Sequence, residues 1–269
     1  MHPHEHVPAA GPPLLTVVAV VALVVGAAAY AAGLRAARAR SPWPARRTLC
    51  WYAGLACAGA ATVGPLAEAS RSSFTAHMAG HVLLGMLTPL LLVLAAPVSL
   101  LLRTLPAARA RRVSAALRSP AARVVGHPVV AGLLAAGGLW LLYTTGLFHR
   151  AHASAPVGLV VHAHVLLAGW LLTASLVGPD PHPSRATFRV RAIVLVGFVA
   201  AHSVLAKWLY AHPPAGVSAA DARAGAQLMY YAGDVVDVAL MVLLVSGWYA
   251  ATRPRDLAPA RVRERTGLA

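Results

Sequence analysis

The sequence predicts an all-α, polytopic membrane helix bundle with about seven transmembrane helices. Hydrophobic residues make up 58% of the 269 residues and charged residues only 12%, whereas roughly a quarter of residues are charged in soluble domains. Apolar runs long enough to cross a hydrocarbon core, which takes about 20 residues, recur along the whole chain. The predicted spans are 13–33, 49–67, 76–101, 127–147, 156–177, 191–211 and 224–250.

Prolines mark several of the predicted helix ends, because proline cannot donate a backbone hydrogen bond inside a helix. They stand before the first span, before the second and after the fifth, at Pro12, Pro13, Pro42, Pro44, Pro179, Pro181 and Pro183. We therefore expect three parts: a His-rich extracytoplasmic tail (1–12), a seven-helix transmembrane domain (13–250) and a basic cytoplasmic tail (251–269).

Arginines predict the orientation of the bundle. Nineteen of them fall in four clusters on one side of the predicted membrane, and only Arg71, Arg150 and Arg223 fall on the other. Positively charged loops stay in the cytoplasm, so we expect the N-terminus outside and the C-terminus inside. The formal charge of +15 then reports topology, and we expect the lipid bilayer but no nucleic acid as a partner. The Ala- and Arg-rich composition, with one lysine, is typical of a GC-rich bacterial genome, so the expected location is the bacterial plasma membrane.

Histidines follow the opposite pattern, since eleven of thirteen lie on the predicted outer side. His77 and His81 are four residues apart on one helix and share a face. With a rise of 1.5 Å per residue, polar residues from four helices fall roughly 9–15 Å below the outer boundary. The candidate metal-site residues are His77, Met78, His81, His162, His164, His202, Asp234 and Asp237.

Copper is the metal that these side chains favour. Intramembrane ionisable groups are costly to expose to lipid and are expected to face one another. A single buried histidine is more often a hydrogen-bonded core residue, but the shared depth on four helices favours a joint site. Imidazole and thioether ligands suit Cu(I), whereas too few thiolates and carboxylates are present for zinc-thiolate or calcium sites. The Asp234–Asp237 pair would orient ligating histidines, and the tract at His2, His4 and His6 would capture metal as an auxiliary site.

A family resemblance rests on the segment HMAGHVLLGMLTPLLLVLAAP at 77–97. It resembles the hallmark segment of the CtaG family of cytochrome c oxidase (caa-type) assembly factors. Two departures are Val82, where a Met is common in the family, and Tyr230, where a Trp is frequent. Weaker matches are LFHRAH at 147–152, HAHVLLAGWLL at 162–172, GPDPHP at 178–183 and the D-x3-G-x-Q-x-M pattern from Asp221 to Met229.

The resemblance implies a non-enzymatic protein that helps to mature the oxidase by handling copper, with oxidase subunits or other assembly factors as partners. No nucleophile elbow, phosphate loop or H-E-x-x-H pair occurs in the sequence. On this hypothesis Cu(I) is held by His77, His81 and one or more of His162, His164 and His202. Two alternatives remain open: a haem-binding electron-transfer protein with two axial histidines, and a metal or proton transporter that uses the Asp pair and Lys207.

Overall fold

The computed structural model describes residues 14–38, 42–181 and 185–253 of the chain. Every regular element in these residues is a helix, which confirms the all-α prediction. The expected N-terminal tail (1–12) lies outside the described residues, as does the expected C-terminal tail beyond residue 253. The elements are α1 (Leu14–Ala37), α2 (Ala45–Thr62), α3 (Pro65–Ala69), α4 (Phe74–Val82), η1 (Leu83–Leu87), α5 (Thr88–Leu94), α6 (Pro97–Thr104), α7 (Ala107–Leu117), α8 (Pro120–Val125), α9 (Pro128–Thr144), α10 (Leu147–Ala153), α11 (Ala155–Val177), α12 (Phe188–Ala211) and α13 (Ala219–Thr252).

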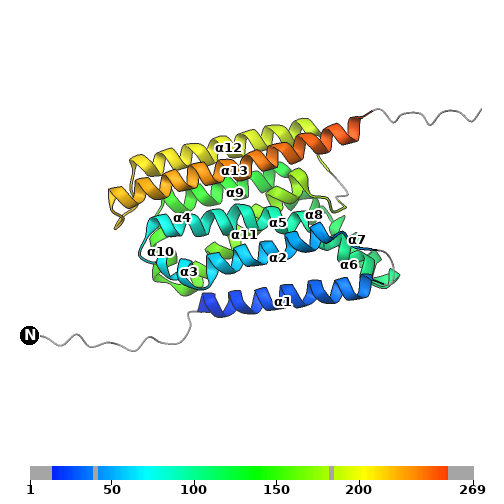
Figure 1. Cartoon of the computed structure of the whole chain (residues 1–269). Helices are drawn as coiled ribbons and strands as arrows, with labels where there is room; N and C mark the ends of the chain where they lie inside the picture. Colours follow the sequence, from blue (N-terminus) through cyan, green and yellow to red (C-terminus); the bar gives the residue numbers. More distant parts are fainter. Residues whose placement is uncertain (1–13, 39–41, 182–184, 254–269) are drawn as a thin grey trace, which may run out of the picture.

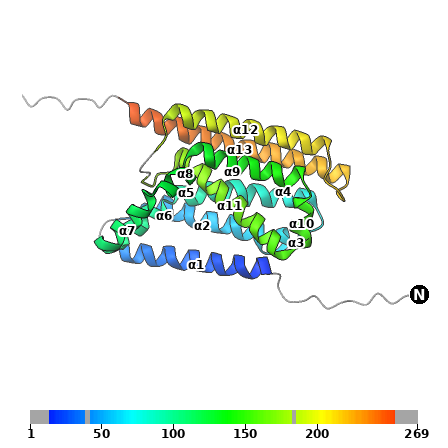
Figure 2. The same ribbon diagram turned by 180° about the vertical axis from the view of Figure 1, so that it is seen from behind.

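The long helices lie side by side in layers. In Figures 1 and 2, α12 and α13 form one side of the bundle, α1 forms the opposite side, and α4, α5 and α11 run between them. The main packed pairs are α12 with α13, α13 with α4, α9 with α11, and α2 with α5. The start of α4, helix α10 and the end of α12 lie together at what we call the histidine end. Helices α6, α7 and α8, which carry several arginines, lie at the opposite end, which we call the arginine end.

The chain is a multi-pass membrane protein. Within the described residues, six helices are long and apolar enough to cross a membrane, and a seventh span results if one bent pair is counted as a single crossing. That pair is α9 and α10, which meet at an angle of 80°. The expected span 127–147 therefore ends near Thr144, and the residues that follow, including His149 and His152, form a short helix.

The third span changes its helical geometry twice. A π-helical turn, η1, separates α4 from α5, and Ala96 takes a left-handed conformation (φ 52°) before α6. Pro89 contributes to the first change, because it cannot donate the hydrogen bond that a regular helix would require there. Asp180 accepts hydrogen bonds from the backbone N–H groups of Val98 (3.1 Å) and Ser99 (2.7 Å) and so caps α6 after the second change. The GPDPHP segment thus has a structural role at the arginine end.

Helix α11 approaches the π-helical turn closely at two glycines. A Cβ added at Gly169 would overlap the carbonyl oxygen of Gly85, and one added at Gly85 would lie 2.7 Å from Val165. Small residues permit this kind of close helix contact in membrane proteins. The contact holds α11 against the segment that follows His81.

Replacing Gly169 by alanine is expected to destabilise the protein by about 1–3 kcal/mol, because the backbone of Gly85 cannot move aside without disturbing the turn. Chemical denaturation in detergent would measure the change. Gly137→Ala is the matched control, since nothing lies within 4 Å of a Cβ added there. Equal stability of the two variants would contradict this account of the helix contact.

Candidate metal site at the histidine end

The start of α4 is fixed by a carboxylate from α13. Asp221 accepts hydrogen bonds from the backbone N–H groups of Phe74 (2.6 Å) and Thr75 (3.0 Å) and from the Thr75 hydroxyl (2.6 Å). The Ser73 hydroxyl accepts a further bond from Ala76 N–H (3.3 Å). The first N–H groups of a helix have no partner within the helix, and a negative charge near them is favourable. Asp221 therefore sets the position of α4 against α13, and with it the positions of His77 and His81.

His77 is held by aromatic side chains from α9 and α10. Its Nε2 lies 3.0 Å from the Tyr143 hydroxyl, and its ring centroid lies 5.1 Å from that of Phe148. The Tyr143 hydroxyl also donates to Met78 Sδ at 3.9 Å. The 3.0 Å hydrogen bond between His77 Nε2 and the Tyr143 hydroxyl fixes the orientation of the His77 ring.

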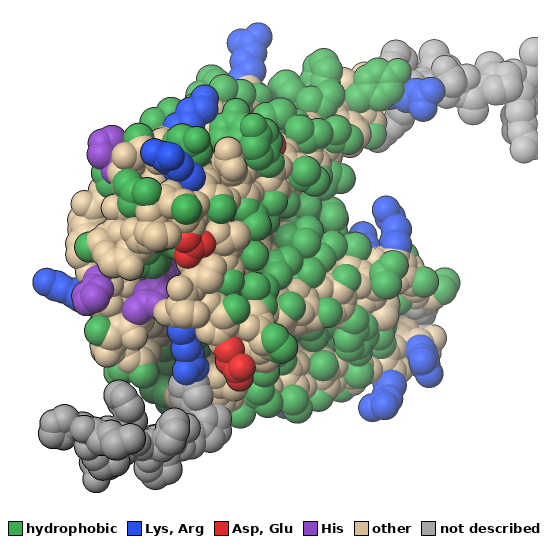
Figure 3. Space-filling view, turned by 60° about the vertical axis from the view of Figure 1, so that its left-hand side comes forward, with side chains coloured by type: hydrophobic (Ala, Val, Ile, Leu, Met, Phe, Trp, Pro, Cys, Tyr) green, Lys and Arg blue, Asp and Glu red, His purple; other side chains and the backbone are tan. Residues whose placement is uncertain are grey.

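Three of the candidate histidines line one small cavity. His77 and His81 come from α4 and His162 comes from α11, and the Tyr143 side chain closes the cavity from α9. The cavity volume is about 40 Å³, which is enough for a water molecule or an ion but not for a large ligand. Figure 3 shows histidine side chains gathered on the surface of this end of the molecule.

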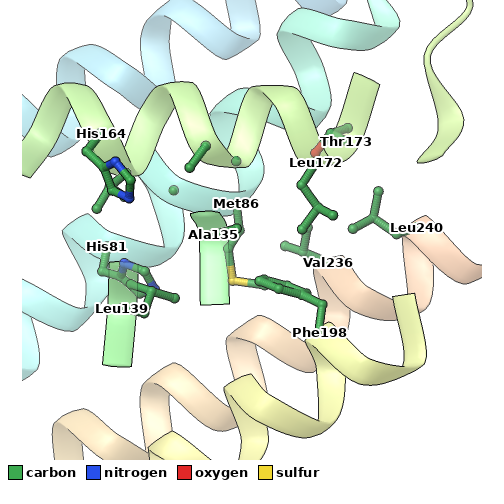
Figure 4. A pocket seen from close by; sticks show the side chains of 14 residues that line it. His81, Met86, Ala135, Leu139, His164, Leu172, Thr173, Phe198, Val236 and Leu240 are labelled. Carbon is green, nitrogen blue, oxygen red and sulfur yellow. The ribbon is translucent and has the colours of Figure 1, made fainter. Parts of the chain in front are cut away.

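His81 also lines a second small cavity of about 30 Å³. Figure 4 shows His81 and His164 at one end of this cavity, and the Met86 sulfur beside the Phe198 ring further along it. His81 is 8% exposed, and its Nε2 atom is buried without a hydrogen-bond partner. A buried nitrogen without a partner costs about 1–3 kcal/mol, so this atom is available to a ligand.

His162 and His164 face different neighbours although they are two residues apart. His162 Nδ1 donates to the Gly158 carbonyl of its own helix (2.8 Å), which leaves Nε2 as the nitrogen with a lone pair. His164 Nε2 donates to the Leu134 carbonyl of α9 (3.1 Å), and its ring packs against Gly138. Residues two apart on a helix do not share a face. His162 therefore lines the cavity that it shares with His77 and His81, whereas His164 packs against α9.

His202 and Asp237 are buried deeper, at 2% and 1% exposure. The His202 ring stacks on that of His81 with centroids 6.1 Å apart, and it packs over Gly233 of α13, where a Cβ would come within 2.6 Å of it. Both ring nitrogens of His202 and both carboxylate oxygens of Asp237 have no hydrogen-bond partner. Burial of unpaired polar atoms is rare in stable proteins, so these groups mark a polar position inside an otherwise apolar core.

The remaining acidic and basic candidates lie outside this cluster. Asp234 is half-buried one turn from Asp237. The Lys207 ammonium lies over the ring of Tyr230, 5.4 Å from its centroid, in a cation–π contact. This contact places Lys207, which the transporter alternative would use, against an aromatic ring of α13.

Across residues 14–38, 42–181 and 185–253, no three His, Cys, Asp or Glu side chains converge closely enough to hold a metal ion in this conformation. The arrangement instead offers pairs of rings: His77 with His152 (5.2 Å between centroids) and His81 with His202 (6.1 Å). Sequence reasoning missed two residues that position these histidines. Asp221 is the first residue of the weakly specific D-x3-G-x-Q-x-M pattern. Nothing in the sequence distinguishes Tyr143 from the other tyrosines.

The fold and the site define a multi-pass membrane protein with partly unsatisfied histidines buried at one end of its helix bundle. The sequence model of the cytochrome c oxidase caa3 assembly factor family (Caa3_CtaG) matches residues 28–251. The chain belongs to this family, which confirms the resemblance carried by the 77–97 segment. The family is one of assembly factors.

Mycobacterial proteins are among the curated relatives. Uncharacterised proteins of Mycobacterium bovis and Mycobacterium tuberculosis are each 31% identical over 194 residues, and one of Mycobacterium leprae is 28% identical over 201 residues. These matches cover 67% to 70% of this chain but only 28% to 30% of the relatives. The chain thus spans less than a third of the length of these proteins. No solved structure matches the chain significantly.

Removing the Asp221 carboxylate is expected to loosen α4. Asp221→Ala leaves two backbone N–H groups and the Thr75 hydroxyl without their acceptor, at a cost of about 1–2 kcal/mol. Thermal unfolding in detergent, compared with that of the wild type, would measure the loss. Glu68→Ala is the control, because Glu68 is an exposed carboxylate at the same end. A melting temperature as high for Asp221→Ala as for Glu68→Ala would refute the capping role.

Proposed function

We propose that this protein assists cytochrome c oxidase assembly by holding Cu(I) as cargo in the cavity lined by His77, His81 and His162. The observation that carries the proposal is this cavity of about 40 Å³, into which two helices direct three imidazoles. Copper enters as a substrate to be passed on, so a site with few ligands suits the task. Family membership supplies the oxidase as the setting.

The side chains around the cavity match the chemistry of Cu(I). Imidazole and thioether groups are soft enough to bind it, and Cu(I) tolerates low coordination numbers. Met78 lies fully buried beside His77, and Met86 lines the cavity on the other side of His81. These methionines are the available thioethers, since Val82 stands where the family commonly has a Met. His202 and Asp237 would then accept the ion or orient His81 from below.

Two features favour this proposal over the alternatives. A porphyrin needs a pocket of several hundred Å³, whereas the cavities beside His81 measure about 30 and 40 Å³. A transporter needs a polar path towards the arginine end, and the buried side chains there are mainly apolar, such as Leu176, Leu195 and Leu244, with few polar ones such as Thr173 and Ser175. Both observations support a site that is served from the histidine end.

The proposal also concerns the side of the membrane that the site faces. From the positive-inside rule, we infer that the arginine end faces the cytoplasm and that the histidine end lies outside the bacterial plasma membrane. The histidine tract at residues 1–12 would then collect metal on the same side. Oxidase subunits or other assembly factors are the partners that would receive copper from this end.

Removing two ligands tests the copper site. In a Cu(I) competition titration of the detergent-purified protein, His77→Ala combined with His81→Ala is expected to weaken binding by more than about 100-fold, beyond the loss typical of outer-shell changes. His212→Ala is the control, because it removes an exposed histidine that stacks on Trp208 at the same end. Binding that survives in the double variant would refute this ligand set. In cells that lack the wild-type protein, the double variant should also lower the copper content of the oxidase.

Tyr143 positions His77 through its hydroxyl, so Tyr143→Phe should weaken Cu(I) binding by about tenfold while the protein stays folded. The same titration would measure this change. Tyr210→Phe removes an exposed hydroxyl at the same end of the bundle and serves as the control. If both variants bind Cu(I) as tightly as the wild type, the Tyr143 hydroxyl does not organise the site.

A further inference from the structure

Helix α10 places an exposed histidine beside the buried cluster. Because α10 turns by 80° from α9, it lies across the histidine end of the bundle. His152 is exposed on this helix, and its ring centroid lies 5.2 Å from that of the half-buried His77, with a tilt of 50°. Phe148 lies against both rings, with centroids 4.5 Å from His152 and 5.1 Å from His77. The pair is therefore held in place by packing.

The free nitrogen of His152 is defined by its one hydrogen bond. Its Nδ1 lies 2.9 Å from the Phe148 carbonyl oxygen, which can only accept. Nδ1 therefore carries the proton and Nε2 carries the lone pair. A hydrogen bond from one ring nitrogen to a backbone carbonyl is the usual way in which a metal-ligating histidine is oriented.

The histidines become steadily less exposed along one direction. His152 is exposed, and His77 is half-buried at the wall of the cavity that it shares with His81 and His162. His81 is 8% exposed and His202 is 2% exposed. Neighbouring rings in the pairs His152–His77 and His81–His202 are 5.2 and 6.1 Å apart. These rings are the neighbouring imidazoles that an ion moving inward along this direction would meet.

We propose that His152 is the loading residue of the copper site. It takes Cu(I) from a donor at the histidine end and passes it to His77, from which the ion reaches the cavity shared with His81 and His162. Both steps are ligand exchanges: a bond from copper to His152 forms as a bond from copper to the donor breaks, then a bond to His77 forms as the bond to His152 breaks, and copper remains Cu(I) throughout. This inference rests on the proposed function, because it concerns how that site fills.

His149 provides a matched comparison on the same helix. It stands one turn before His152 and is also exposed, but within the described residues its ring contacts no other aromatic or histidine ring. A surface histidine of α10 that merely attracts copper would act equally from either position. Only His152 is placed to pass the ion to His77.

The experiment measures the rate at which the detergent-purified full chain takes up Cu(I) from a chromogenic Cu(I) chelator by stopped flow, together with the equilibrium affinity. His152→Ala is expected to slow uptake by about tenfold, the lower end of the variation seen in association rates among variants of one site. Its equilibrium affinity is expected to stay near the wild-type value, which also shows that the site is folded. His149→Ala is expected to match the wild type in both measurements.

Each other outcome overturns a definite statement. Uptake by His152→Ala at the wild-type rate, or equal slowing by His149→Ala, overturns the loading role while the copper site stands. Loss of equilibrium affinity in His152→Ala makes His152 a permanent ligand and also overturns the loading role. A wild-type protein that takes up no Cu(I) overturns the proposed function, and the loading role with it.

Discussion

The bonds between the Asp221 carboxylate and the first turn of α4 are the contact on which the histidine arrangement depends. They join two helices that are distant in sequence, and they satisfy N–H groups of the first turn that have no partner within the helix. His77 lies within the first turn of α4 and His81 one turn further, so the rotation of α4 about its axis decides which cavity each ring meets.

Glycines allow the other helices to approach His81 closely. Gly85 and Gly169 let α11 approach the π-helical turn, and Gly233 makes room for the His202 ring on α13. The result is a tightly packed region in which imidazoles lie near one another while several of their nitrogens bond to nothing. Packing therefore holds these rings in position, and their coordinating atoms remain free. π-helical turns are frequent at functional sites, and this one directly follows His81.

Much of the fold could be predicted from hydropathy and charge, because both follow from the membrane environment. The apolar runs predicted the spans, and depth along the helices grouped His81 with His202, whose rings lie 6.1 Å apart. Depth does not specify rotation, however, so His164 was grouped with His162 although it turns towards α9. The bend before α10 and the roles of Tyr143 and Asp221 depend on contacts between segments far apart in sequence. A single sequence contains no direct signal for such contacts.

On the proposed function, the distribution of polar groups also constrains how copper leaves. Beyond Met86, the buried core towards the arginine end is built mainly from apolar side chains, with buried hydroxyl groups such as those of Thr173 and Ser175. An ion that moved in that direction from the cavity lined by His77, His81 and His162 would leave the imidazoles behind. Release would therefore take place at the histidine end, through the same rings that load the site. Donor and client must then use this end in turn, and a small number of ligands favours both steps, since each bond that holds the cargo must break before it can be delivered.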